Sequence, residues 1–246
     1  MANTFHGFKA ESFLFFEELA KNNQKAWFDA NRERYDQYVV GAFRGLLEAI
    51  TPALLELNPH FEVGGKTNGS FSRINRDIRF SKDKSPYKSN YYLYVYDNRH
   101  DRGHAGRLYV GLSADCLTVG FSIYGSWKGP KGALETQFRQ RVAKHRETFS
   151  TLLAKVLPPR RYETYWHREE KGEWPQYPGL ARRDEDWQTL QAWVVRKVFL
   201  PNARGLGSPA FANTVERIFA ELYPLFIFTS ATSPKWEAEL KKALAK

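Results

Sequence analysis

The spacing of apolar residues changes twice along this chain. Between residues 10 and 58, apolar side chains recur at three- and four-residue intervals, as on one face of a helix. Between residues 91 and 124 they alternate with other residues at every second position, which is the period of a β-strand. Helical spacing returns after residue 133. Helices followed by a strand meander and then by further helices predict an α+β fold.

The helical segments can be placed from this spacing. The first covers Ala10–Lys21, and Asn22-Asn23 interrupts it and can cap the next helix. We expect further helices over Gln24–Ile50, Ala133–Val156, Trp187–Val198 and the segment from Phe211 to Leu222.

Three strands stand out, namely Tyr91–Tyr96, Arg107–Leu112 and Leu117–Tyr124. Their short connections favour antiparallel neighbours. We therefore predict a central antiparallel sheet with N-terminal and C-terminal helices packed on it. In the third strand, Leu117, Val119, Phe121 and Ile123 are expected to face inward and the alternate residues outward. Phe61–Val63 and Gly69–Ile74 are weaker strand candidates, and Arg160–Asp186 is expected to be irregular.

Length and composition narrow the class of protein. With 246 residues and 42% hydrophobic residues, the chain can bury one core, and we expect a single α+β domain over residues 1–246. The single cysteine, Cys116, excludes a disulfide framework within the chain and a multi-cysteine zinc site. No apolar run approaches the roughly 18 to 20 residues that span a bilayer. Met1–Ala20 has no secretory signal pattern, so we expect a cytoplasmic protein without a membrane partner.

The net charge of +10 is unevenly distributed. Met1–His60 holds 6 basic and 8 acidic residues, whereas the much shorter segment Arg73–Lys88 holds 6 basic and 2 acidic residues. Such a concentration of positive charge favours anionic partners.

The residue types in Arg73–Lys88 suit recognition of phosphate. Arginine presents a planar fork of donors that matches phosphate or carboxylate, and lysine adds point charges. Arg76 and Arg79 lie between apolar neighbours and are the preferred ligand contacts. The predicted ligand-binding residues of this segment are Arg73, Arg76, Asp77, Arg79, Ser81, Lys82, Lys84, Tyr87 and Lys88.

A structural interpretation of the same segment stays open. Asp77 and Asp83 could neutralise neighbouring arginines and brace the loop. We expect Asp77 to pair with an arginine and to be partly buried, so that Asp77→Asn would lower the melting temperature clearly.

A stripe of Asn23, Trp27, Asn31 and Tyr35 runs along the second predicted helix. An aromatic stripe usually lies in the core. In the functional interpretation, Asn31 and Tyr35 face the basic segment Arg73–Lys88 and orient a ligand. Both are predicted site residues. A buried amide needs a hydrogen-bond partner, and the arginine-rich loop could supply it.

Other motifs are weaker. Tyr92, Tyr94 and Tyr96 share one strand face that could stack bases or pack under helices. His100 and His104, with Asp97 and Asp101, could bind a metal, although a solvated turn is favoured. The glycine-rich loop Gly125–Gly132 lacks the ending of a nucleotide-binding P-loop. We expect no metal and no cofactor.

Three stretches together resemble a known family. They are Asn22-Asn23, Trp27-Phe28, Asn31-Arg32 and Tyr35; the basic segment Arg73–Lys88; and the tyrosine-rich strand with the two strands after it. In this order and spacing they resemble the uncharacterised bacterial family called domain of unknown function 2461. The resemblance covers roughly the N-terminal half, while Tyr165–Asp186 and the tail after Thr229 depart from it. It implies an α+β fold and no established reaction.

Three functions therefore stay open. The first is binding of a phosphate-bearing ligand or a nucleic acid through the basic loop. The second is an enzyme that acts on a phosphorylated small molecule, with Asp77 or Asp83 as acid or base. The third is a scaffold or interaction protein in which the basic motif is structural.

Overall fold

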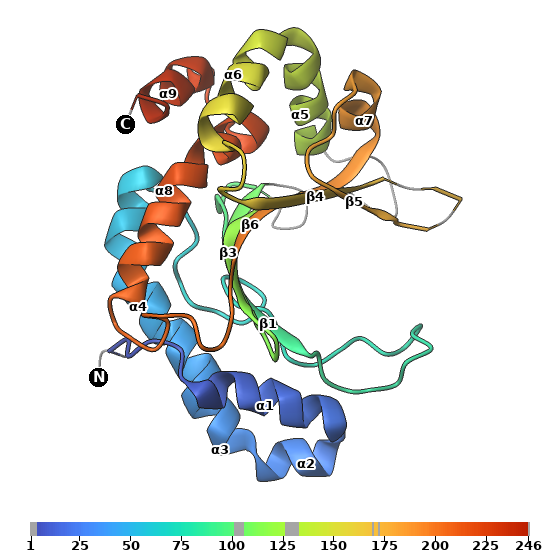
Figure 1. Cartoon of the computed structure of the whole chain (residues 1–246), viewed down its shortest axis with the longest axis vertical. Helices are drawn as coiled ribbons and strands as arrows, with labels where there is room; N and C mark the ends of the chain where they lie inside the picture. The colour runs from blue at the N-terminus through green and yellow to red at the C-terminus, as the bar shows by residue number, and fades with distance from the viewer. Residues whose placement is uncertain (1–3, 101–105, 126–132, 169, 172, 246) are drawn as a thin grey trace. The chain divides into compact units, whose positions relative to one another are not determined.

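The computed structural model describes residues 4–100, 106–125, 133–168, 170, 171 and 173–245. It is an α+β structure with a six-stranded antiparallel sheet, on which the N-terminal helix α4 and the C-terminal helix α8 pack (Figure 1). The predicted fold class is confirmed. The helical elements are α1 (Ala10–Lys21), α2 (Lys25–Ala30), α3 (Arg32–Tyr35), the π-helix η1 (Asp36–Gly41), α4 (Ala42–Leu57), α5 (Ala133–Lys144), α6 (Arg146–Val156), α7 (Asp184–Thr189), α8 (Phe211–Ser230) and α9 (Trp236–Ala243).

The sheet has the strand order β1-β2-β3-β6-β4-β5. Its strands are β1 (Asn90–Val95), β2 (Arg107–Ser113), β3 (Leu117–Tyr124), β4 (Glu163–Arg168), β5 (Gln176–Pro178) and β6 (Leu190–Phe199). The first three strands follow the chain, as their short connections predict. The last strand in sequence, β6, then lies between β3 and β4, where it pairs antiparallel with β4.

The prediction of a helix over Trp187–Val198 is wrong for most of its length. Helix α7 ends at Thr189, and β6 follows directly. Val194 and Val195 are buried on opposite faces of β6, so its apolar residues do not alternate with polar ones. A strand that is buried on both faces imitates helical spacing, and its β-branched residues are the better signal.

The inward and outward faces predicted for Leu117–Tyr124 also differ from the structure. Strand β3 has the predicted bounds, but Thr118 and Ser122 are buried along with the apolar positions. The strand lies within the sheet, and Tyr124 at its end is the one partly exposed residue of the strand.

Several other predicted segments are shorter or broken. The helix expected over Gln24–Ile50 is divided into α2, α3, η1 and α4, and Asn31 ends its first part. The helix expected over Ala133–Val156 is interrupted at His145. Gly69–Ile74 forms only isolated bridges, including one from Phe71 to Leu93, and Phe61 lies in another. The segment expected to be irregular contains the antiparallel pair β4–β5.

One continuous helical stretch of the described residues, Arg32–Leu57, is long and apolar enough to cross a membrane by length and composition alone. This differs from the expectation that no segment of the chain has such properties. The stretch buries Val39, Phe43, Leu46 and Ile50 in the protein core. Burial of an apolar stripe is typical of a core helix, which passes the same test of length and composition.

The chain divides into two compact units. The first comprises Met1–Val95, Tyr109–Thr118 and Val198–Arg217, and the second comprises Tyr96–Leu108, Val119–Lys197 and Ile218–Lys246. Each unit has an aromatic core. In the first, Phe43 and Tyr91 meet edge to face, and in the second Phe121 packs on Trp193 in the same way. The single-domain organisation stays a prediction.

Candidate functional site

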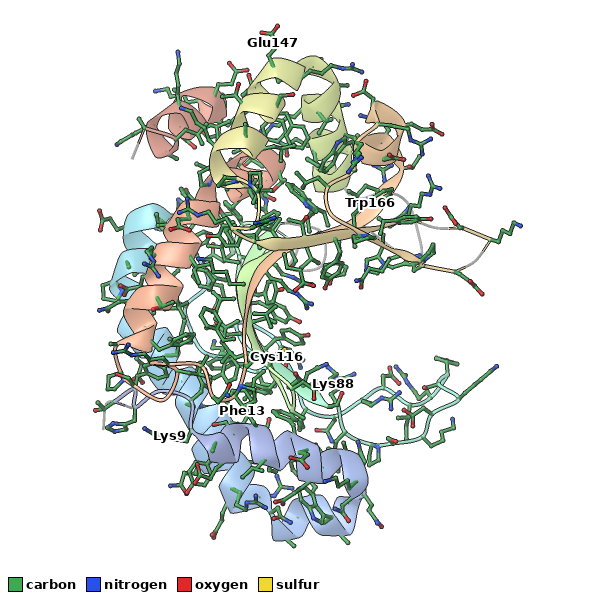
Figure 2. The ribbon with its side chains drawn as sticks, in the orientation of Figure 1. Lys9, Phe13, Lys88, Cys116, Glu147 and Trp166 are labelled. Carbon is green, nitrogen blue, oxygen red and sulfur yellow. The ribbon has the colours of Figure 1, made fainter. Side chains whose placement is uncertain are left out.

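The basic loop, Arg73–Lys88, belongs to the first unit and leads into β1. A single antiparallel bridge joins Asn75 to Tyr87 at its base. The Arg76 backbone N–H donates to the Pro86 carbonyl at 2.9 Å, and the Lys88 N–H donates to the Ile74 carbonyl at 2.8 Å. The two arms are thereby held together, and residues 77–85 form the tip. Figure 2 labels Lys88, at the β1 end of the loop.

Two carboxylates at the tip pair with two arginines. Arg79 donates to both oxygens of Asp77, from Nε at 2.9 Å and from Nη2 at 2.6 Å. Arg76 forms an ion pair with Asp83 and also donates to the Ser81 hydroxyl at 3.3 Å. The predicted pairing of Asp77 with an arginine is confirmed.

The predicted burial of Asp77 is wrong. Its side chain is 41% exposed and that of Arg79 is 76% exposed. An exposed ion pair contributes little to stability, because water screens it and because holding the two side chains costs entropy. The large loss of stability expected for Asp77→Asn therefore loses its basis.

Hydrogen bonds hold both carboxylates of the tip in the ionised form. Those from the side chain and backbone of Arg79 lower the pKa of Asp77 well below its usual range. Hydrogen bonds from the side chain and backbone of Ser85, followed by the hydrogen bond from Arg76, lower the pKa of Asp83 in the same way. At neutral pH both groups are ionised and weakly basic, which does not favour the role of general acid or base.

The other cations of the loop have different surroundings. Lys84 Nζ donates to the Ile78 carbonyl at 3.0 Å, and Lys88 is half-buried. Arg73 and Lys82 are exposed, and within the described part of the chain neither forms a hydrogen bond or an ion pair through its side chain. Arg73 and Lys82 are therefore the cations of the loop whose side chains have no hydrogen bond or ion pair within the described residues.

Asn23 and Phe28, from the N-terminal helical region, anchor the base of the loop at Tyr87. The Asn23 amide donates to the Tyr87 carbonyl at 2.9 Å and accepts from the Tyr87 N–H at 3.0 Å. The Phe28 ring stacks on the Tyr87 ring, with centroids 4.1 Å apart. Asn23 was expected to cap a helix, but Gln24 occupies the N-cap position of α2. The sequence signal for this contact is the amide in the aromatic stripe, for which the arginine-rich loop is the expected partner.

Asn31 and Tyr35 do not have the contacts expected of ligand-orienting residues. The Asn31 amide donates to the Trp27 carbonyl at 2.9 Å and accepts from Arg34 at 2.8 Å, so its partners belong to its own helical segment. Tyr35 is buried, and its ring meets those of Phe28 and Tyr91. The core interpretation holds for Tyr35, and the expected contact between Asn31 and the basic loop is absent from the described residues.

The tyrosine face of β1 adjoins this site. Tyr92 and Tyr94 are half-buried with nearly parallel rings 5.4 Å apart, whereas Tyr96 is buried. The Tyr92 N–H donates to the Ser72 hydroxyl at 3.0 Å, so the backbone of β1 at Tyr92 lies beside the residue that precedes the basic loop.

The weaker motifs add no site within the described residues. His104 and Asp101 of the metal alternative lie outside them, as does nearly all of the glycine-rich loop, residues 126–132. Elsewhere in the described residues, no group of three or more His, Cys, Asp or Glu side chains could hold a metal ion.

The protein is of the α+β class, with an antiparallel sheet and a basic loop that leads into the first strand of that sheet. The chain belongs to the conserved hypothetical protein family DUF2461, whose sequence model matches residues 11–228. The match passes well beyond the N-terminal half that carried the resemblance and includes Tyr165–Asp186. A search of curated proteins found no match.

Proposed function

We propose that this protein binds a phosphate-bearing ligand through the basic loop. The observation that carries the proposal is the loop's charge: six cations against two carboxylates, with both carboxylates already paired to Arg76 and Arg79. Arg73 and Lys82 are then the leading ligand contacts. A bound phosphate would relieve the repulsion among these cations.

Arg76 and Arg79 have a different part in this proposal. Each already binds a carboxylate, so they brace the tip and hold its positive charge in place. The structural interpretation thus accounts for the ion pairs within the tip, and ligand binding accounts for the surplus charge beside them. Asn23 and Phe28 support both by fixing the base of the loop at Tyr87.

The experiment is a melting series of the full chain in phosphate, pyrophosphate and nucleotide against chloride at matched ionic strength. A ligand that binds only the folded state stabilises it by about 2.7 kcal/mol at a hundredfold excess over its dissociation constant. We expect the wild type to be stabilised, and the double variant Arg73→Gln with Lys82→Gln to lose most of that response.

The matched control is Lys21→Gln with Lys25→Gln. It removes the same amount of positive charge from two exposed positions of the first unit. Lys21 pairs with Glu17 and Lys25 pairs with Asp29, in each case four residues away along the chain. The control should respond to phosphate like the wild type. Equal responses of the loop variant and the wild type would contradict the proposal. Binding of nucleic acid would be distinguished by a steep loss of affinity with added salt.

A further inference from the structure

The second unit has its own group of arginine and tyrosine side chains on one face of the sheet. Trp166 is buried and lies on the side of β4 that faces α5 and α7 (Figure 2). Successive strand residues point to opposite faces, so Tyr165 and Glu163 lie on the other face. In the β4–β6 register Glu163 is opposite Arg196, which brings Arg196 to this face as well.

Arg196 is held rigidly on this face. It donates to both oxygens of Glu163, from Nε at 3.2 Å and from Nη2 at 2.9 Å, and its guanidinium lies 5.1 Å from the centre of the Tyr165 ring. A bidentate ion pair and a stacking contact together fix the plane of the guanidinium.

Arg107 reaches the same face from β2. Its guanidinium lies 5.2 Å from the centre of the Tyr124 ring, and its Nε donates to the Ser122 hydroxyl at 3.4 Å. Both Arg107 and Arg196 act electrostatically on the Tyr124 hydroxyl, although burial still raises its pKa. Tyr165 belongs to the same group through its contact with the Arg196 guanidinium.

Gly120 explains how β6 comes this close to β3. A Cβ atom at this position would lie 2.1 Å from the Val195 carbonyl oxygen and 2.9 Å from the Arg196 Cα. Both are backbone atoms, which cannot move aside cheaply. The glycine therefore lets the backbone of Arg196 approach β3, where Ser122 and Tyr124 follow on the same face.

We propose that Arg107, Ser122, Tyr124, Tyr165 and Arg196 form a second anion site, which binds a phosphate group. Arg107 and the hydroxyl groups of Ser122, Tyr124 and Tyr165 are the donors, while Arg196, which already binds Glu163, adds positive charge beside them. These side chains come from four strands of one sheet, and a rigid sheet holds them in position without a ligand.

The donor set distinguishes phosphate from carboxylate. A phosphate group presents more acceptor oxygens than a carboxylate and can accept from guanidinium and hydroxyl donors in several directions. A carboxylate already lies in the plane of the Arg196 fork, in the form of Glu163. The hydroxyls of Tyr124 and Tyr165 are protonated at neutral pH, because an unperturbed tyrosine has a pKa of about 10, and burial raises the pKa of each further. Both can therefore act as donors.

The experiment is calorimetric titration of the full chain with inorganic phosphate, with succinate as the carboxylate probe. It is performed in the background Arg73→Gln with Lys82→Gln, so that the basic loop does not contribute. In that background we expect saturable binding of phosphate that Arg107→Gln weakens at least about tenfold, because a charge-assisted hydrogen bond is lost. Arg146→Gln is the matched control, since it removes an exposed arginine of the same unit and should leave binding unchanged.

Tyr124→Phe removes one hydroxyl and keeps the ring on which Arg107 stacks, so it tests the site even where Arg107→Gln fails to fold. It should weaken phosphate binding with little change in thermal stability. The proposal is overturned if the background variant binds no phosphate, if Tyr124→Phe binds it like the background, or if succinate binds as tightly. None of these results bears on the basic loop, which is tested separately.

Discussion

At the scale of single residues, Asn23 makes the contact most specific to the candidate site. Its amide gives and accepts one hydrogen bond at the Tyr87 backbone, across a separation of 64 residues. One side chain thus satisfies a backbone donor and a backbone acceptor, in addition to the two backbone hydrogen bonds that join the arms of the loop.

Asn23→Ala should lower the free energy of unfolding by about 1 to 3 kcal/mol, because it leaves two partly buried backbone groups without partners. Urea denaturation measures this change. Asn23→Asp is the control, since it keeps the acceptor for the Tyr87 N–H but places a carboxylate oxygen against the Tyr87 carbonyl. An alanine variant as stable as the wild type would show that the loop base is held by other contacts.

The buried tyrosines Tyr35 and Tyr91 should make the stability of the fold depend on pH in the alkaline range. Burial raises the pKa of Tyr35, and burial also raises the pKa of Tyr91 to about 12. An unfolded tyrosine ionises near pH 10, with a pKa of about 10. Between the unfolded pKa of about 10 and the raised folded pKa values, the folded state holds more protons than the unfolded state. The contribution of these tyrosines to stability is therefore complete below about pH 10 and is lost as the pH rises above it.

Tyr35→Phe removes one of these groups and should make the fall shallower by up to about 1.4 kcal/mol per pH unit. Denaturation curves of both proteins across the alkaline range measure the difference. Identical slopes would mean that Tyr35 ionises as readily in the folded state as in the unfolded state.

At the scale of elements, helix α8 ends on a buried arginine. The guanidinium of Arg141 donates to the carbonyls of Ile227 at 3.1 Å and of Phe228 at 2.9 Å, and to that of Ala231. It also lies 4.3 Å from the centre of the Trp236 ring. The last carbonyls of a helix have no partner within it, and here a side chain from α5 supplies one.

Arg141→Ala should destabilise the protein by at least about 2 kcal/mol, because several buried carbonyls lose a charged donor. Arg141→Lys keeps the charge and should recover part of the loss. Thermal unfolding of these variants can be compared with Arg146→Ala, whose ion pair with Asp184 is exposed and should matter little. Equal effects at the two arginines would exclude the capping role.

At the scale of the whole molecule, the division into two units cuts through continuous elements. Strands β2, β3 and β6 and helix α8 each contribute residues to both units. A strand or helix that breaks in the middle loses backbone hydrogen bonds in both units. We therefore expect the units to unfold together.

A single calorimetric transition, with equal calorimetric and van't Hoff enthalpies, is the expected result. It would also support the single-domain organisation predicted from the sequence. Two resolved transitions would contradict both expectations and would identify the units as independent domains.

Local patterns were sufficient for much of this molecule. Helix α1 and strand β3 have the bounds that their periodicity predicts, and the sheet is antiparallel as the short connections indicate. Amphipathic spacing reports directly on an element with one buried face. The pattern fails for β6, whose two buried faces leave no alternation to recognise.

The sequence by itself determined the α+β class, the first three strands, the family and the concentration of charge in Arg73–Lys88. The tertiary structure decided how that charge is used: Asp77 is exposed, Tyr35 lies in the core, and Asn23 rather than Asn31 meets the loop. Periodicity and composition are local properties, so they can be read along the chain. Burial and pairing between distant residues depend on which surfaces meet, and only the folded chain brings those surfaces together.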